Sequence, residues 1–113
     1  MKKTKNDLLQ GTLDLLILKI LSTGQLHGWD ISKRIQLVSK ERILVKQGSL
    51  YPAVHRLEQK GFIEAEWGVS EAGRSAKFYQ LTRKGKTQLN VETQYWLDFS
   101  ESVSLILSLE NPS

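Results

Sequence analysis

The sequence of 113 residues contains no cysteine, which excludes disulfide bonds and thiolate chemistry. It also has no glycine-rich loop of the kind that binds phosphate groups. Its two histidines lie in separate motifs, and no nucleophile is paired with a base at a recognisable spacing. These absences argue against an enzyme, and we expect no cofactor.

A long hydrophobic run is also missing. The most apolar segment, LDLLILKIL at residues 13–21, is too short to span a membrane and is interrupted by Asp14 and Lys19. The basic N-terminus MKKTKND resembles the start of a signal peptide, but no small-residue cleavage site follows an uninterrupted apolar segment. We therefore expect a cytoplasmic protein in a reducing environment, with no membrane partner.

Two residue pairs have a spacing that occurs at metal sites. His27 and Asp30 are three residues apart at a possible helix start, and His55 and Glu58 are three apart within a later helix. Neither pair has the second cluster of ligands that a metal site needs. We interpret His27 as a helix-entry residue and the later pair as a surface contact, and we expect no metal site.

The length fits one domain with a single hydrophobic core. Sixteen Lys and Arg against twelve Asp and Glu give a formal charge of +4, which favours a polyanionic partner without requiring one. Several lysines lie in residues 1–7, which we predict to be a flexible basic arm. Those lysines most simply keep the chain soluble, and phosphate contact is the alternative.

Periodic apolar residues predict the first two helices. Leucine and isoleucine recur at steps of three and four from Leu9 to Leu21, which predicts a helix over about 8–22. Further leucines widen its apolar face, so we expect it to be covered on two sides, by its own domain or by a partner chain. A shorter stripe predicts a second helix over residues 27–40.

The segment QGSLYPAVHRLEQKG predicts a third helix over residues 49–60. Pro52 lacks an N–H and is tolerated in a first turn, so the helix is expected to begin near Ser49, a suitable N-cap. At about 100° per residue, one arc of the helix forms a core face. That arc consists of Leu50, Ala53, Val54 and Leu57. The opposite, outward surface carries Tyr51, His55 and Arg56.

Two strands and a long helix follow. Residues 62–68 alternate apolar and acidic side chains, as a half-buried strand does, and residues 77–82 are rich in β-forming residues. A polar loop of about eight residues, 69–76, would join them as a hairpin. Thr82 is then expected to cap a last helix over residues 83–108.

The last helix has a sustained apolar pattern with a seven-residue period. Its members are Leu89, Trp96, Phe99, Val103 and Ile106. A domain of this size has little core left for the far end of such a stripe, so we predict a dimer interface there. The alternative is that the helix folds back on the first helix.

This order of elements predicts a mainly α protein with a small β-hairpin, namely a winged helix-turn-helix domain over residues 8–82. The C-terminal dimerisation helix and tail would occupy residues 83–113. In such a domain the third helix enters the major groove of DNA and the hairpin, or wing, flanks it. Ser49 and Tyr51 can bind phosphates, and His55 and Arg56 can reach base edges or phosphates. From the wing, Arg74 and Lys77 can reach an adjacent groove.

Three segments also resemble the PadR family of transcriptional regulators, from about residue 8 to the end. They are LLQGTLDLLILKILSTGQLHGWDISKRI, QGSLYPAVHRLEQKGFIEAEWG and GRSAKFYQLTRKG. The chain is similar to the short branch of that family, whose single last helix serves dimerisation. The resemblance implies a homodimeric repressor that binds an inverted repeat in double-stranded DNA and often responds to small aromatic or cationic compounds.

The same resemblance carries DNA contacts onto Ser49, Tyr51, His55 and Arg56 in the third helix and onto Arg74 and Lys77 in the wing. Family members commonly have a more basic wing tip than the Ser75 and Ala76 found here. The resemblance also places a ligand at the dimer interface, near Trp96 and Phe99. The alternative is that these two side chains are only large interface residues. A winged-helix module that binds a protein instead of an operator is the alternative function.

Overall fold

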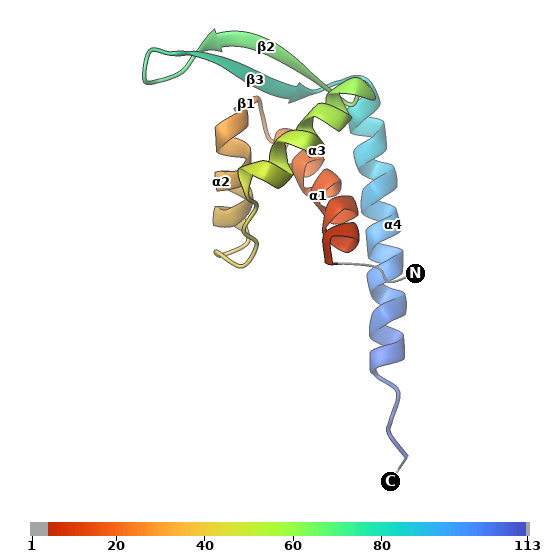
Figure 1. The fold of residues 1–113 in the computed structure, drawn as a ribbon. Helices are drawn as coiled ribbons and strands as arrows, with labels where there is room; N and C mark the ends of the chain where they lie inside the picture. Colours follow the sequence, from red (N-terminus) through yellow and green to blue (C-terminus); the bar gives the residue numbers. More distant parts are fainter. Residues whose placement is uncertain (1–4, 113) are drawn as a thin grey trace.

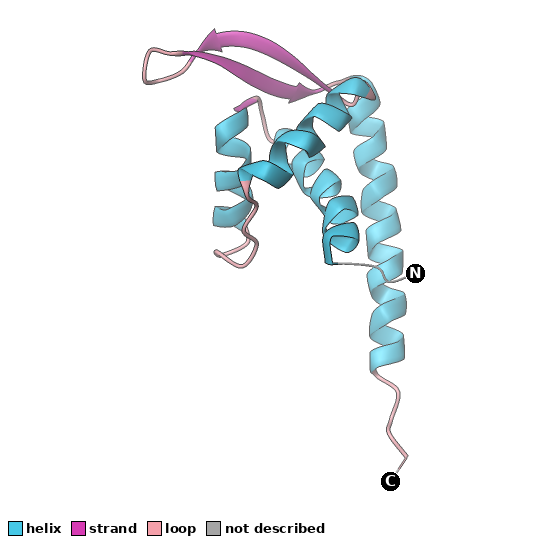
Figure 2. Ribbon diagram, in the orientation of Figure 1, coloured by secondary structure: helices cyan, strands magenta, loops and turns pink. Residues whose placement is uncertain are grey.

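The computed structural model describes the backbone of residues 5–112 and the side chains of residues 11–112. Its elements are α1 (Lys5–Leu21), β1 (Leu26–His27), α2 (Gly28–Val38), α3 (Gln47–Gln59), β2 (Ile63–Val69), β3 (Ser75–Leu81) and α4 (Arg83–Leu107). Figures 1 and 2 show α1, α2 and α3 below the hairpin and the long α4 at one side. The first four residues of the predicted basic arm lie outside the described residues, and the last three belong to α1.

The core lies between α1, α2, α3 and the base of the hairpin. Its largest fully buried side chains are Ile17, Leu18, Ile31, Leu50, Leu57 and Ile63. Helix α1 contacts α2 and α3 and also α4, so the prediction that it is covered on two sides is confirmed, and its own chain supplies the cover. Within the described part of the chain, no helix is both long and apolar enough to cross a membrane.

The antiparallel sheet has the strand order β1-β3-β2, and β1 was not predicted. It consists of only two residues, Leu26 and His27, paired with Tyr79 and Phe78. Two residues are too few for a period of two to be recognised. The predicted hairpin is confirmed, but its loop is shorter than expected: β2 ends one residue later, at Val69, and β3 begins two residues earlier, at Ser75, which leaves a five-residue loop, 70–74. The positive φ of 78° at Gly73 makes this tight turn possible.

The predicted cap of the last helix is confirmed. Thr82 is the N-cap of α4, and its Oγ1 accepts a hydrogen bond from the backbone N–H of Gly85 at 3.0 Å. Gly85 also allows the helix to pass close to the preceding chain, because a Cβ atom there would lie 1.9 Å from the carbonyl oxygen of Phe62. These contacts fix the direction in which α4 leaves the hairpin.

Helix α4 has two parts with different surroundings. Its first turns pack on α1, and Leu89 is 8% exposed and belongs to the hydrophobic core. Leu89, which was predicted to lie at a dimer interface, is thus already buried within one chain. The remainder extends away from the domain (Figure 1), so the chain measures 64 × 29 × 28 Å along its principal axes.

Candidate nucleic-acid interface

Helix α3 begins two residues earlier than predicted. Lys46 is its N-cap and makes no side-chain capping bond, and the backbone N–H of Ser49 donates to the Lys46 carbonyl at 2.9 Å. The prediction that Ser49 is the N-cap is therefore wrong. A tertiary contact explains the earlier start: Nε2 of Gln47 donates to Oγ of Ser32 on α2 at 2.9 Å, which holds the first turn of α3 against α2.

Pro52 therefore lies inside the helix and not in its first turn. Without an N–H, Pro52 cannot donate to the carbonyl of Gly48 four residues earlier. Gly48 is exposed, so water can bind that carbonyl in place of the missing donor. The proline is tolerated because this turn of α3 faces solvent.

Helix α3 has a packed side and an exposed side. The predicted core residues, Leu50, Ala53, Val54 and Leu57, are each at most 2% exposed. Ser49, Tyr51 and His55 are exposed, as expected. In Figure 1 this helix crosses in front of α1, so its exposed side faces the viewer. A hydroxyl, a phenol and an imidazole on this helix are thus open to solvent.

Arg56 does not lie free on that surface. Its Nη2 donates a hydrogen bond to Oδ1 of Asp14 on α1 at 2.7 Å, and the two side chains are 28% and 19% exposed. The expectation that Arg56 points outward is corrected by this contact. Asp14 is 42 residues away along the chain, so no local pattern could show that it lies beside Arg56.

The two predicted wing residues differ in their surroundings. Arg74 is exposed in the loop at the tip of the hairpin and makes no ion pair with any residue the structure describes. Lys77 is half-buried, and its Nζ lies 3.9 Å from Oε1 of Glu58 on α3. That Nζ also lies 6.0 Å and 5.9 Å from the ring centres of Trp67 and Tyr79. Lys77 therefore links the hairpin to α3.

Tyr79 lies where the hairpin meets the helices. Burial, and then the nearby Glu58 and Tyr51, raises the pKa of the Tyr79 phenol above its ordinary value. The phenol therefore stays neutral at physiological pH and adds no negative charge to the surface between α3 and the wing.

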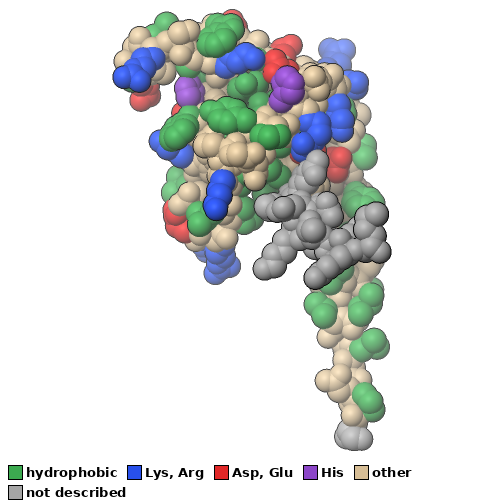
Figure 3. Space-filling model, viewed as in Figure 1, with side chains coloured by type: hydrophobic (Ala, Val, Ile, Leu, Met, Phe, Trp, Pro, Cys, Tyr) green, Lys and Arg blue, Asp and Glu red, His purple; other side chains and the backbone are tan. Residues whose placement is uncertain are grey.

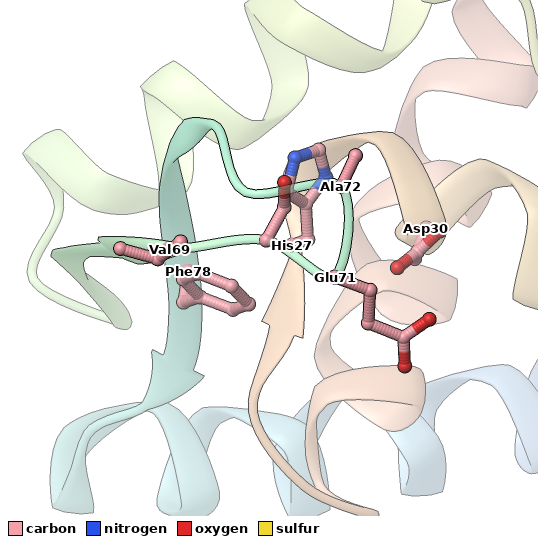
Figure 4. A pocket seen from close by; sticks show the side chains of 7 residues that line it. His27, Asp30, Val69, Glu71, Ala72 and Phe78 are labelled. Atoms are coloured by element: carbon pink, nitrogen blue, oxygen red, sulfur yellow. The ribbon is translucent and has the colours of Figure 1, made fainter.

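His27 acts as the helix-entry residue that the sequence indicated. Its Nδ1 accepts a hydrogen bond from the backbone N–H of Trp29 at 3.0 Å, and its ring forms a T-shaped pair with the Phe78 ring, with the ring centres 5.7 Å apart. Figure 4 shows His27 with Asp30 and Glu71 around a hollow of about 370 Å³ between the wing loop and α2. The described residues contain no group of three or more His, Cys, Asp or Glu arranged for a metal ion.

The outer part of α4 exposes the remaining residues of the predicted apolar stripe. Trp96 and Phe99 are 44% and 48% exposed, and Val103 and Ile106 are 37% and 66% exposed. The rings of Tyr95 and Phe99 stack with centres 6.4 Å apart. Figure 3 shows hydrophobic side chains along the lower half of this helix, whereas Lys and Arg side chains are spread over the body of the molecule. One chain alone leaves this apolar surface in contact with water.

Comparison with known proteins places this arrangement in a family. Residues 17–91 match the transcriptional regulator PadR-like family. An uncharacterized protein X from Lysinibacillus sphaericus is 30% identical over 103 residues, which cover 91% of this chain and 94% of that protein. The negative transcriptional regulator PadR of Bacillus subtilis (strain 168) is 30% identical over 78 residues, 69% of this chain and 43% of that protein.

A solved structure also matches this chain. The crystal structure of a PadR-like transcriptional regulator from Bacillus cereus strain ATCC 14579 has a TM-score of 0.78 and 31% identity, and the match covers 92% of this chain and 99% of that chain. These findings confirm the resemblance that the three sequence motifs indicated. The chain belongs to the PadR-like family of transcriptional regulators and has the winged helix-turn-helix fold of DNA-binding proteins.

Proposed function

We propose that this protein is a repressor that binds a palindromic operator as a homodimer. The observation that carries the proposal is the division of α3 into a fully packed side and an exposed side with Ser49, Tyr51 and His55. The packed side fixes the position of the helix, and the exposed side offers hydrogen-bonding groups to DNA. The family consists of transcriptional regulators and not of enzymes, which agrees with a binding role.

Each exposed group suits a different part of the duplex. The Ser49 hydroxyl and the Tyr51 phenol can donate hydrogen bonds to phosphate oxygens. Such phosphate contacts position a helix in the groove. The imidazole of His55 can donate to an acceptor on a base edge, which specifies sequence. The net charge of +4 favours the approach of this surface to a polyanion.

Arg56 retains a role in this proposal despite its contact with Asp14. A guanidinium group has five N–H donors, and the hydrogen bond to Asp14 uses one of them. The remaining donors can bind a phosphate at the edge of the groove. Arg74 at the wing tip and Lys77 on the wing would add contacts to the neighbouring backbone.

The homodimer is supported by the surface of α4. Trp96, Phe99, Val103 and Ile106 are exposed in one chain, and such a set of large apolar side chains is typical of a helix that packs against another helix. A two-fold dimer would place two copies of α3 in successive major grooves about 34 Å apart.

A small effector would bind among the aromatic side chains of α4. Trp96 and the stacked Tyr95 and Phe99 offer flat aromatic faces at the proposed dimer interface. An indole ring attracts cations and stacks on aromatic compounds, so a small aromatic or cationic ligand is the expected class.

Negative regulation is proposed because the Bacillus subtilis relative is named a negative transcriptional regulator.

Selection of bound sequences from a random pool of DNA duplexes tests the proposal. We expect an inverted repeat whose half-sites are about one helical turn apart, and an affinity that falls steeply as salt is raised. An asymmetric selected sequence would contradict the palindromic operator. If no duplex is enriched and affinity for DNA does not depend on salt, the fold serves instead as a protein-interaction module.

A further inference from the structure

The two faces of the β2–β3 hairpin differ in their charged residues. Trp67 pairs directly across from Lys77, and Ala65 pairs with Tyr79, so these four side chains share one face. We call this face the inner wing face, and Trp67 and Lys77 lie one pair before its outermost pair, Val69 and Ser75. The opposite face carries Glu64 and Glu66, and Gln80 there donates a hydrogen bond to Glu64 at 2.8 Å.

The inner wing face is the one turned toward α3. Ile63, at the start of the same face, is 1% exposed in the core. Farther along it, the 3.9 Å contact between Lys77 and Glu58 joins the face to α3. The exposed side of α3 and the inner wing face are therefore neighbouring surfaces, and the acidic residues of the two strands lie on the side turned away from α3.

Trp67 is left uncovered on this face. It is 67% exposed, although its alternation with Ile63 and Ala65 predicts a buried side chain. The reason is that the hairpin extends beyond the helices that cover its base (Figure 1). The surface presents a flat apolar ring, an indole N–H donor and the ammonium group of Lys77, which lies 6.0 Å from the ring centre.

We propose that the inner wing face binds the sugar-phosphate backbone beside the groove that α3 enters, with Trp67 packed against a deoxyribose. This inference rests on the proposed function and adds Trp67 to its DNA contacts. A deoxyribose offers C–H groups to the indole face, and the adjacent phosphate accepts from the indole N–H and attracts Lys77. The separation of charge between the two faces favours this polyanionic occupant.

Binding of labelled duplexes, measured by fluorescence anisotropy, tests the inference with two probes. One is the duplex selected by the wild-type protein, and the other is an unrelated duplex of equal length. We expect Trp67→Ala to weaken binding to both by roughly tenfold, because a sugar contact carries no sequence information. For Trp67→Ala, the slope of log affinity against log salt concentration should stay unchanged, because the lost side chain is neutral. Lys77→Gln removes a positive charge and should reduce that slope by about one.

Two matched variants locate the effect on the inner face. Trp67→Phe keeps an aromatic ring and should retain most of the affinity. Glu66→Gln changes the adjacent residue on the opposite face and should not weaken binding. Because Trp67 is largely exposed, Trp67→Ala should melt at the same temperature as the wild type.

A second measurement does not depend on the fold of the alanine variant. In a chain with Trp29→Phe and Trp96→Phe, Trp67 is the only remaining tryptophan. Because Trp96 lies in the proposed dimer interface, this chain is used only after anisotropy shows that it binds the selected duplex. Added duplex should then change its emission and protect it from iodide quenching. Unchanged emission and quenching would overturn the inference, as would Trp67→Ala binding both duplexes like the wild type.

Two other outcomes point to different occupants or to an earlier failure. If Trp67→Ala changes the molecular mass in solution but leaves DNA affinity unaltered, a second copy of the chain covers this face and the inference is overturned. If the wild-type protein itself binds no duplex, the proposed function fails together with the inference. Failure of the inference alone requires a wild-type protein that binds its selected duplex.

Discussion

Nη2 of Arg56 on α3 lies 2.7 Å from Oδ1 of Asp14 on α1, and this contact joins the helix with the proposed DNA-binding surface to the helix at the centre of the core. Asp14 would otherwise leave a half-buried negative charge beside the surface proposed for DNA. The ion pair neutralises that charge and restricts the side chain of Arg56.

A double-mutant cycle of Asp14→Asn and Arg56→Gln measures the strength of this contact. We expect a coupling of about 1 kcal/mol in the free energy of unfolding, because the pair is partly exposed and water screens it. Urea denaturation of the wild type, the two single variants and the double variant provides the measurement. Additive effects of the two substitutions would show that the contact contributes nothing to stability.

Substitutions on the exposed side of α3 should separate sequence reading from positioning. His55→Ala is expected to lose about 1–3 kcal/mol of binding free energy on the selected operator and to relax specificity at one base position. Tyr51→Phe, which removes only a hydroxyl, should weaken binding to all duplexes alike by severalfold, or about 1 kcal/mol. Asn90→Ala, at an exposed position of α4, serves as a control. Equal specificity profiles for His55→Ala and the wild type would remove His55 from base recognition.

The two parts of α4 should respond differently to substitution. Leu89→Ala removes a buried side chain and should destabilise the monomer by about 2–4 kcal/mol, as urea denaturation would measure. Trp96→Ala combined with Val103→Asp changes exposed residues and should instead give a folded monomer in analytical ultracentrifugation. The DNA affinity of this variant should also fall, because a monomer can contact only one half-site of the operator. A double variant that still sediments as a dimer would place the interface elsewhere.

Two glycines within helices should have opposite effects when changed to alanine. Gly85→Ala would put a Cβ atom 1.9 Å from the carbonyl oxygen of Phe62 and should destabilise the protein by at least about 2 kcal/mol, because the backbone must move. At Gly11 in α1, a new Cβ would have no atom of the described residues within 4 Å beyond its own stretch of helix, so Gly11→Ala should stabilise the protein by up to about 1 kcal/mol. Thermal unfolding of the two variants tests both predictions. A Gly85→Ala protein as stable as the wild type would contradict the close approach of Gly85 to the Phe62 carbonyl.

The features that the sequence predicted follow from local rules. The apolar arc of Leu50 to Leu57 depends on the 3.6-residue period of a helix, and the Thr82 cap depends on a hydroxyl next to unpaired N–H groups. The PadR-like motifs span these same elements, so the family and the fold class were both accessible before any contact was known. The start of α3 was missed because the local rule for Pro52 was outweighed by the contact of Gln47 with α2.

The sequence by itself determined the order of the helices and the hairpin and the packed side of α3, because each depends on neighbours within a few positions along the chain. Only the tertiary structure decided what those residues touch. It paired Arg56 with Asp14, buried Leu89 against the core and left Trp67 uncovered. These contacts depend on which distant segments lie beside each side chain and on how far an element extends beyond its neighbours. The periodic pattern of apolar residues along the chain predicts neither.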